Sequence, residues 1–275
     1  MDKNNSQKIT FDEYINNPMG KENTVFSHRD MYANLYKEKL DKILVRENAH
    51  IDYKLYIDKN KEAYYVYIKV PSEVIENFYY DVVIQMTPKD SNFAMQRNLK
   101  NYKVRFFSND PSFVFTFVHA FYKKDLFIKD LSSKMTKEAL KEVGKEKNPE
   151  DQIGYVKSLY FAYLIMKQKG LFEKVKFESE GEPINWKKLL SQIEHADSKI
   201  NERQEEQTKL NKHKKAEKKK DQDEYNKGRN EKLNAVSNDK KRQNGLSINN
   251  IKNIANSKTS NRVNVKNRIK RTKSI

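Results

Sequence analysis

IDYKLYID, at residues 51–58, and AYYVYIKV, at residues 63–70, flank the short polar turn DKNK at residues 58–61. In the first run apolar residues alternate with mostly polar ones, and this period of two is typical of a β-strand. The second run is rich in tyrosine, valine and isoleucine, which favour strands. Two such runs joined by a short polar turn predict a β-hairpin.

Two further strands are predicted beyond the hairpin. Residues 79–86 form an apolar run that Thr87 and Pro88 end, and residues 102–107 form another that SNDP at 108–111 ends. Four strands of this length predict an antiparallel sheet with one face covered by helices. The fold class expected is therefore α+β, with a small antiparallel sheet packed with helices, followed by a long helix and a basic extended arm.

Helical patterns lie on both sides of these strands. A capping residue at Ser27 and spaced apolar residues predict a helix at about 28–46. The apolar segment 112–122 fits either a strand or a buried helix, and we favour a helix. Further helices are expected at 136–143 and 149–169, the second ending at Gly170. A last helix, over 186–210, carries a heptad seam that becomes polar in its second half: Leu189, Ile193, Ala196, Ile200, Arg203, Gln207 and Leu210.

Charge and aromatic residues divide the chain in opposite ways. Residues 209–275 hold 21 Lys and Arg against 6 Asp and Glu, whereas the whole chain carries a net charge of +17. After Trp186 the sequence has one aromatic residue, Tyr225. A segment of this composition cannot build a core, so we expect it, as helix or as disordered chain, to be solvated, bound to something anionic, or wrapped over a partner. The predicted domains are a body at 1–185, an exit helix at 186–210 and a basic arm at 211–275.

Signs of catalytic chemistry are weak. The chain has no cysteine, and its five histidines match no metal-site motif. His119 lies in an apolar run, which favours a buried structural histidine. Asp81, Asp110 and Asp125 lie on or near the strands, where acid pairs can bind Mg²⁺ in nucleases. However, Asp110 sits in ordinary turn sequence, so we rank a nuclease low. We predict no enzyme activity and no cofactor.

Aromatic strand residues and one strand arginine leave alternatives open. Tyr64, Tyr65, Tyr67, Tyr79, Tyr80, Phe106 and Phe107 could stack on RNA bases, but packing in a core or an interface is favoured. Arg105 could face a partner or pair with an acid. The longest apolar run, residues 113–118, is far shorter than the roughly 20 residues a membrane helix needs, so no membrane is predicted as a partner.

The basic arm holds the candidate binding residues. Its cations could contact the phosphates of nucleic acid or an acidic protein surface: Lys240, Lys241, Arg242, Arg262, Lys266, Arg268, Lys270, Arg271 and Lys273. A short amphipathic patch slightly favours a protein partner, because an electrostatic arm needs no spaced isoleucines: Ile248, Ile251 and Ile254.

Three segments resemble structural proteins of tailed bacteriophages: residues 11–20 (FDEYINNPMG), 104–113 (VRFFSNDPSF) and 154–163 (GYVKSLYFAY). The resemblance covers roughly residues 8–178, and it implies a virion component, near the head–tail junction, that is assembled in the host cytoplasm. We therefore expect a non-enzymatic assembly protein that forms homo-oligomers and contacts other virion proteins, with DNA a further partner of the arm. The alternative is a nucleic-acid-binding accessory protein for replication or DNA packaging.

Overall fold

A computed structural model describes residues 9–16, 37–43, 51–89, 97–141, 148, 151, 153–154 and 156–243, with side chains described up to residue 232. The chain separates into two compact units, Met1–Leu210 and Asn211–Ile275. None of the helices in these described ranges is long and apolar enough to cross a membrane.

The predicted hairpin is confirmed. Strand β1 (Tyr53–Asp58) pairs antiparallel with β2 (Ala63–Pro71), with Tyr56 opposite Tyr65. The carboxylate of Asp58 accepts the backbone N–H groups of Asn60 and Lys61 at 3.1 and 3.2 Å, and this closes the turn. The polar residues between the two runs therefore build the reversal that sets the register of the strands.

The sheet has five strands in the order β4-β3-β2-β1-β5. Strands β3 (Tyr79–Thr87) and β4 (Lys103–Ser108) continue the antiparallel sheet at the positions predicted. The fifth strand, β5 (Glu182–Pro183), was not predicted and lies parallel to β1, with Glu182 opposite Tyr56. The α+β class with a helix-packed, mostly antiparallel sheet is confirmed, and the number of strands is corrected from four to five.

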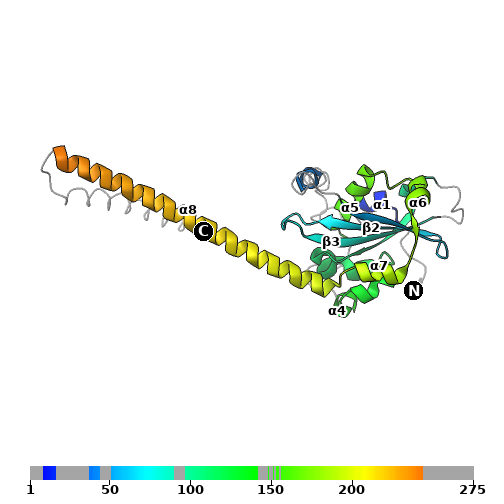
Figure 1. Cartoon of the computed structure of the whole chain (residues 1–275). Helices are drawn as coiled ribbons and strands as arrows, with labels where there is room; N and C mark the ends of the chain where they lie inside the picture. Colours follow the sequence, from blue (N-terminus) through cyan, green and yellow to red (C-terminus); the bar gives the residue numbers. More distant parts are fainter. Residues whose placement is uncertain are drawn as a thin grey trace, which may run out of the picture. The chain divides into compact units, whose positions relative to one another are not determined.

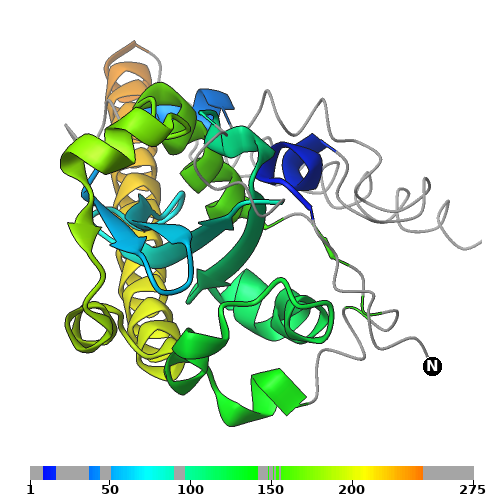
Figure 2. The same ribbon diagram turned by 90° about the vertical axis from the view of Figure 1, so that its right-hand side faces the viewer.

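Both faces of the sheet are buried, so the expectation of one covered face is wrong. Helices α1 (Phe11–Asn16), α5 (Lys157–Gln168) and α6 (Lys174–Glu180) cover one face, and α7 (Trp186–Gln192) lies on the other (Figures 1 and 2). Tyrosines made the sequence ambiguous, because each can be read as polar or apolar. Tyr65 and Tyr67 are buried, and their hydroxyls bond Gln85 and Asp81.

Helix α1 comes from the apolar cluster near the N-terminus. Thr10 and Glu13 form a reciprocal capping box: the Thr10 N–H donates to the Glu13 carboxylate at 2.6 Å, and the Glu13 N–H donates to the Thr10 hydroxyl at 3.1 Å. Phe11 and Tyr14 are fully buried against Phe106 of β4, with ring centroids 5.0 Å apart in each case. Of the helix predicted at 28–46, residues 37–43 are helical and the rest lies outside the described residues.

Short helical segments connect the sheet to α5. After η2 (Leu99–Asn101), the ambiguous apolar segment is helical, as favoured, and consists of the π-helical turn η3 (Phe113–Phe117) followed by α3 (Val118–Lys123). Then come η4 (Lys129–Lys134) and α4 (Lys137–Lys141). The hydroxyl of Thr136 accepts the N–H of Ala139 and caps α4 near its predicted start.

Helix α5 ends as predicted but begins later. The described residues 151, 153, 154 and 156 are not helical, so the predicted start at 149 is wrong. Gly170 has a φ of 66°, and the Leu171 N–H reaches the Met166 carbonyl at 2.8 Å. This is the Schellman ending that a glycine after the last turn indicates.

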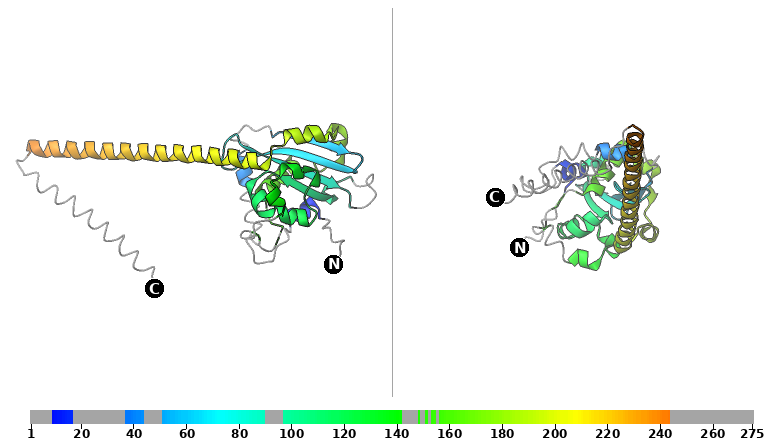
Figure 3. Two further views of the ribbon diagram at one scale, coloured as in Figure 1. Left: turned by 90° about the horizontal axis from the view of Figure 1, so that it is seen from below. Right: turned by 90° about the vertical axis from the view of Figure 1, so that its left-hand side faces the viewer.

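The helix predicted over 186–210 is two helices, α7 and α8 (Ala196–Gln243), separated at residues 193–195. Leu189, Ile193, Ala196 and Ile200 are buried in the hydrophobic core of the first unit. The apolar half of the heptad seam therefore packs on the body. Beyond residue 210, where both helix and disorder were open, the chain continues as helix through Gln243 without a break (Figures 1 and 3).

Candidate binding surfaces

The predicted arm residues are mostly outside the part of the chain that the structure describes. Lys240, Lys241 and Arg242 fall in the last turns of α8. The remaining cations, from Arg262 to Lys273, and the isoleucines Ile248, Ile251 and Ile254 lie outside the described residues. The assignment of all twelve as binding residues stays a prediction.

The described part of α8 beyond Leu210 is a solvent-facing helix. Between residues 211 and 232 every side chain is exposed and Gly228 is half-exposed. Nine Lys and Arg lie there, and the structure records no ion pair for any of them among its described residues: Lys212, Lys214, Lys215, Lys218, Lys219, Lys220, Lys227, Arg229 and Lys232. A positive side chain that has no carboxylate partner is available to an external anion.

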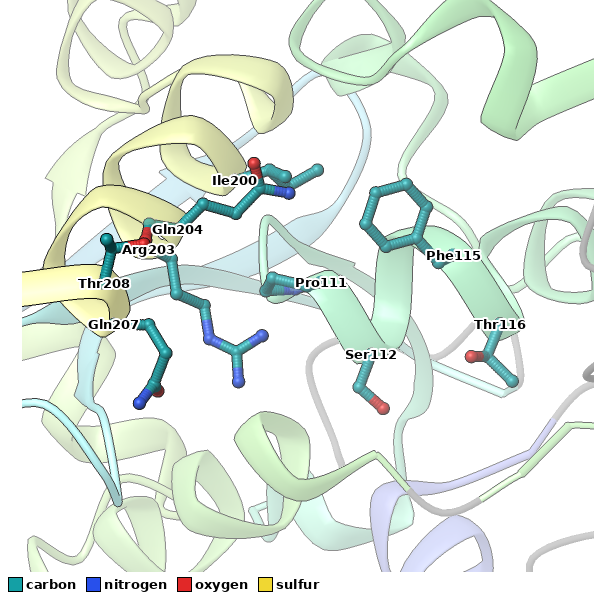
Figure 4. Close-up of a pocket in the computed structure, with 9 residues that line it drawn as sticks. All are labelled: Pro111, Ser112, Phe115, Thr116, Ile200, Arg203, Gln204, Gln207 and Thr208. Carbon is teal, nitrogen blue, oxygen red and sulfur yellow. The ribbon is translucent and has the colours of Figure 1, made fainter. Parts of the chain in front are cut away.

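A groove of about 730 Å³ lies in the first unit, between the first turns of α8 and the η3 turn (Figure 4). Pro111 and Ile200 are buried in its floor, and Phe115 stays 46% exposed beside it. None of its nine lining residues is acidic: Pro111, Ser112, Phe115, Thr116, Ile200, Arg203, Gln204, Gln207 and Thr208. The other polar groups are hydroxyls and carboxamides.

Arg203 sets the electrostatics of this groove. Its guanidinium lies over the start of the η3 segment, on the side of Pro111 and Ser112 (Figure 4). The structure records no hydrogen bond or ion pair for Arg203 among the described residues. Asp110 precedes Pro111 in the chain and is buried; burial raises its pKa, although the Ser112 N–H bonds its carboxylate at 2.9 Å and the positive charge of Arg203 acts to lower the pKa. The groove can thus accept a carboxylate or phosphate against an apolar floor.

Asp81, a candidate metal ligand, is a structural anchor. Its carboxylate accepts the Tyr67 hydroxyl at 2.8 Å, the Asn109 amide at 3.0 Å and the Glu194 backbone N–H at 2.9 Å. Asp81 is 2% exposed, so these three donors take the place of water. The contact to Glu194 ties strand β3 to the break between α7 and α8.

The other candidate acids are also held by neighbouring groups. The guanidinium of Arg105 pairs with Asp125, which answers the question that its strand position left open, and Lys129 bonds the same carboxylate at 3.0 Å. Asp81, Asp110 and Asp125 form no metal-ligand group, and no group of three or more His, Cys, Asp or Glu that could hold a metal occurs among the described residues. The geometry thus offers no support for the nuclease hypothesis.

Two further interpretations can be compared with the structure. His119 is half-buried rather than buried, and its Nδ1 lies 3.1 Å from Asp151, which also binds Lys123. The aromatic strand residues form core and not a stacking platform, since all but the half-buried Tyr79 are buried.

The sequence signal for the groove was absent, because its two walls are about 90 residues apart. For the exposed helix, the sequence does hold a signal, namely the helical spacing of its charged residues. The net charge of the segment, which adds all the charges together, does not show this spacing. In comparisons with known proteins, no family model, no curated protein and no solved structure matches this chain.

Proposed function

We propose that this chain is a non-enzymatic assembly protein of a phage particle, in which the α+β body is the packing unit and helix α8 is an arm that docks on an anionic partner. The observation that carries the proposal is the helix over 211–232, whose nine cations are exposed and have no recorded ion pair. The phage context rests on the resemblance of residues 11–20, 104–113 and 154–163.

The arrangement of the body supports a binding role over a catalytic one. Asp81 and Asp125 are engaged by neighbouring donors, which leaves them poorly placed to move a proton or hold a metal. The groove at Arg203 gives the body a surface with one positive charge and an apolar floor, which could bind a carboxylate of a partner. Other virion proteins, further copies of the chain and packaged DNA are the partners this proposal expects, in a particle assembled in the host cytoplasm.

Chromatography on two immobilised polyanions, heparin and poly-L-glutamate, tests the docking arm. The full chain is compared with a variant in which all nine Lys and Arg of residues 211–232 become Gln, a residue that keeps helix propensity. We expect the wild-type chain to elute from at least one resin at clearly higher salt than the variant. Equal elution of the two proteins would refute the arm as an anion-binding element.

Light scattering of the full chain tests the assembly half of the proposal separately. We expect a mass of at least two chains, that is, a whole-number multiple of 32.7 kDa greater than one. A single-chain mass at every concentration would contradict self-association while leaving the docking arm standing.

The second candidate function is a nucleic-acid-binding accessory protein. One observation favours it, namely that amide and hydroxyl side chains lie among the cations of α8, since these groups also contact phosphates.

A further inference from the structure

The charges of α8 are segregated around its axis. In an α-helix each residue is rotated by about 100° from the one before it. Glu217, Asp221, Glu224 and Glu231 are spaced by four, three and seven residues, which places them on one line along the helix. We call this line the acidic stripe. The fifth carboxylate of residues 211–232, Asp223, lies off the stripe, about 80° around the axis from Glu231 and about 20° from Lys212 and Asn230.

The opposite side of the helix carries no carboxylate between residues 211 and 232. An arc of about 160° holds twelve residues, which we call the acid-free face: Asn211, Lys212, Lys214, Lys215, Lys218, Lys219, Gln222, Tyr225, Asn226, Arg229, Asn230 and Lys232. Seven are cations, four are carboxamides and one is a tyrosine. Every member can donate a hydrogen bond, and every member is exposed.

The hydrogen-bond donors of the acid-free face follow one another along the helix, and such a row matches a regular array of phosphates. Arg, Lys, Asn, Gln and Tyr are the side chains that contact phosphate oxygens in protein–DNA complexes. From Lys212 to Lys232 the helix rises about 30 Å, close to the ~34 Å of one turn of duplex DNA. An α-helix is also about as wide as the major groove, which admits one.

A single strand or an acidic protein surface fits this face less well. Single-strand binding needs aromatic side chains on which bases stack, and the acid-free face has one, Tyr225. A protein surface presents carboxylates without the regular spacing and high density of phosphates.

We infer that the acid-free face of α8 binds the phosphate backbone of duplex DNA without sequence preference, while the acidic stripe faces away from the duplex. This inference rests on the proposed function, since it names the anionic partner of the docking arm. The stripe restricts the orientation, because turning the helix by half a revolution would bring four carboxylates against the phosphates.

Two full-length variants of equal charge test the inference. Lys215→Gln/Lys219→Gln/Arg229→Gln removes three positive charges from the acid-free face. Lys209→Gln/Lys220→Gln/Lys227→Gln removes three from a line that lies outside that face, next to the stripe. Of these, Lys209 is bonded to Glu206 at 2.6 Å, whereas Lys220 and Lys227 have no recorded ion pair among the described residues. The net charge changes equally, so a difference between the variants reports which face binds.

Binding is followed by the anisotropy of a labelled duplex of about two helical turns at several salt concentrations. We expect the first variant to lower the log–log salt slope by about 3, near one for each cation that no longer meets a phosphate. The second variant should change it by less than about 1. Duplexes of unrelated sequence should bind equally, and a single strand of the same length should bind less tightly.

Three results would overturn the inference. Equal losses in the two variants would show diffuse attraction without a preferred face. Binding to labelled poly-L-glutamate but not to the duplex would assign the arm to an acidic protein surface, and the proposed function would survive. Binding to neither polyanion would remove both the inference and the docking arm.

Discussion

Replacing Asp81 by alanine should loosen the junction between α7 and α8 and destabilise the body. The substitution removes a 2% exposed carboxylate that serves three donors at once. Two of the donors, the Tyr67 hydroxyl and the Asn109 amide, belong to the sheet and its β4 exit. The third, the Glu194 N–H, belongs to the interhelical break. If the space that the carboxylate leaves is too small to hold a water molecule for each donor, some of these donors will have no hydrogen-bond acceptor.

The magnitude follows from the cost of buried donors without acceptors, about 1–3 kcal/mol each. The Glu194 N–H is part-buried and can reach water, and Tyr67 can turn its hydroxyl toward the Gln192 carbonyl 3.4 Å away. The Asn109 amide keeps only the Glu194 carbonyl, at 3.3 Å. The cost is therefore about 1–3 kcal/mol, a sizeable part of the roughly 5–15 kcal/mol that stabilises a typical protein. With a urea m-value of about 2 kcal/mol/M, the midpoint should fall by about 1 M.

The fluorescence of Trp186 can report on the unfolding of α7 separately from the rest of the chain. Trp186 is the one tryptophan of the chain, it begins α7, and its ring meets Tyr65 edge-on at 5.2 Å between centroids. Its fluorescence should report the loosening of α7 at lower urea than the circular dichroism of the whole chain. Asp81→Asn is the matched control, because its amide can donate to Tyr67 while its oxygen keeps the other two bonds. It should lose about half as much stability as Asp81→Ala. An unchanged urea midpoint in Asp81→Ala would refute the role of Asp81 as a structural anchor.

The remaining predictions concern two acids and two glycines. Burial raises the pKa of Asp110, so its ionised form opposes folding once the pH rises above the ordinary aspartate pKa of about 4. Asp110→Asn should therefore be more stable than the wild type at pH 7 and lose that gain below about pH 4. Burial also acts on Asp125, but Arg105 and Lys129 outweigh it and lower the pKa. Asp125→Asn should therefore cost about 1–2 kcal/mol of stability at pH 7, and this cost should fade as the pH falls through the folded-state pKa of Asp125. Urea titrations at pH 7 and below about pH 4 check that the two variants change stability in opposite directions. Gly170→Ala should cost about 1 kcal/mol in the same titration, from its positive φ alone, because its Cβ would meet open space. Gly181→Ala should cost more, because its Cβ would lie 2.3 Å from the Phe177 carbonyl and also crowd Ile57 beside β5.

Local patterns predicted the parts of this fold that local interactions specify. The alternation at 51–58, the turn at Asp58 and the glycine at 170 each act within a few residues, and each lies where it was expected. The second covered face of the sheet was missed for a different reason. A tyrosine such as Tyr65 looks polar until a distant partner, here Gln85, donates a hydrogen bond to its hydroxyl inside the core.

Long-range contacts explain the other differences. Strand β5 is two residues long, and its pairing with Tyr56 crosses more than 120 positions of sequence. The break between α7 and α8 contains Ile193, Glu194 and His195, with no glycine or proline to mark it. It is held by the bond from Glu194 to Asp81, 113 residues earlier, which no window of sequence contains. The groove at Arg203 depends on the same break, since the break sets where α8 begins.

The two parts of α8 differ in what stabilises them, and this makes the binding test interpretable. Ala196, Lys199 and Ile200 are buried, with the Lys199 ammonium bonded to Glu202 at 2.8 Å and lying 4.3 Å from the Phe78 ring centroid. Substitutions at these positions would change stability and binding together. The side chains exchanged in the two triple variants are all exposed, and each surface change of this kind shifts stability by about 0.5 kcal/mol or less, in either direction. Both variants should therefore unfold close to the wild-type urea midpoint. If they do, a fall in duplex binding confined to the acid-free face measures the phosphate binding of that face; if the first variant alone unfolds early, that face contributes to folding, and its weaker binding is no longer evidence for a DNA surface.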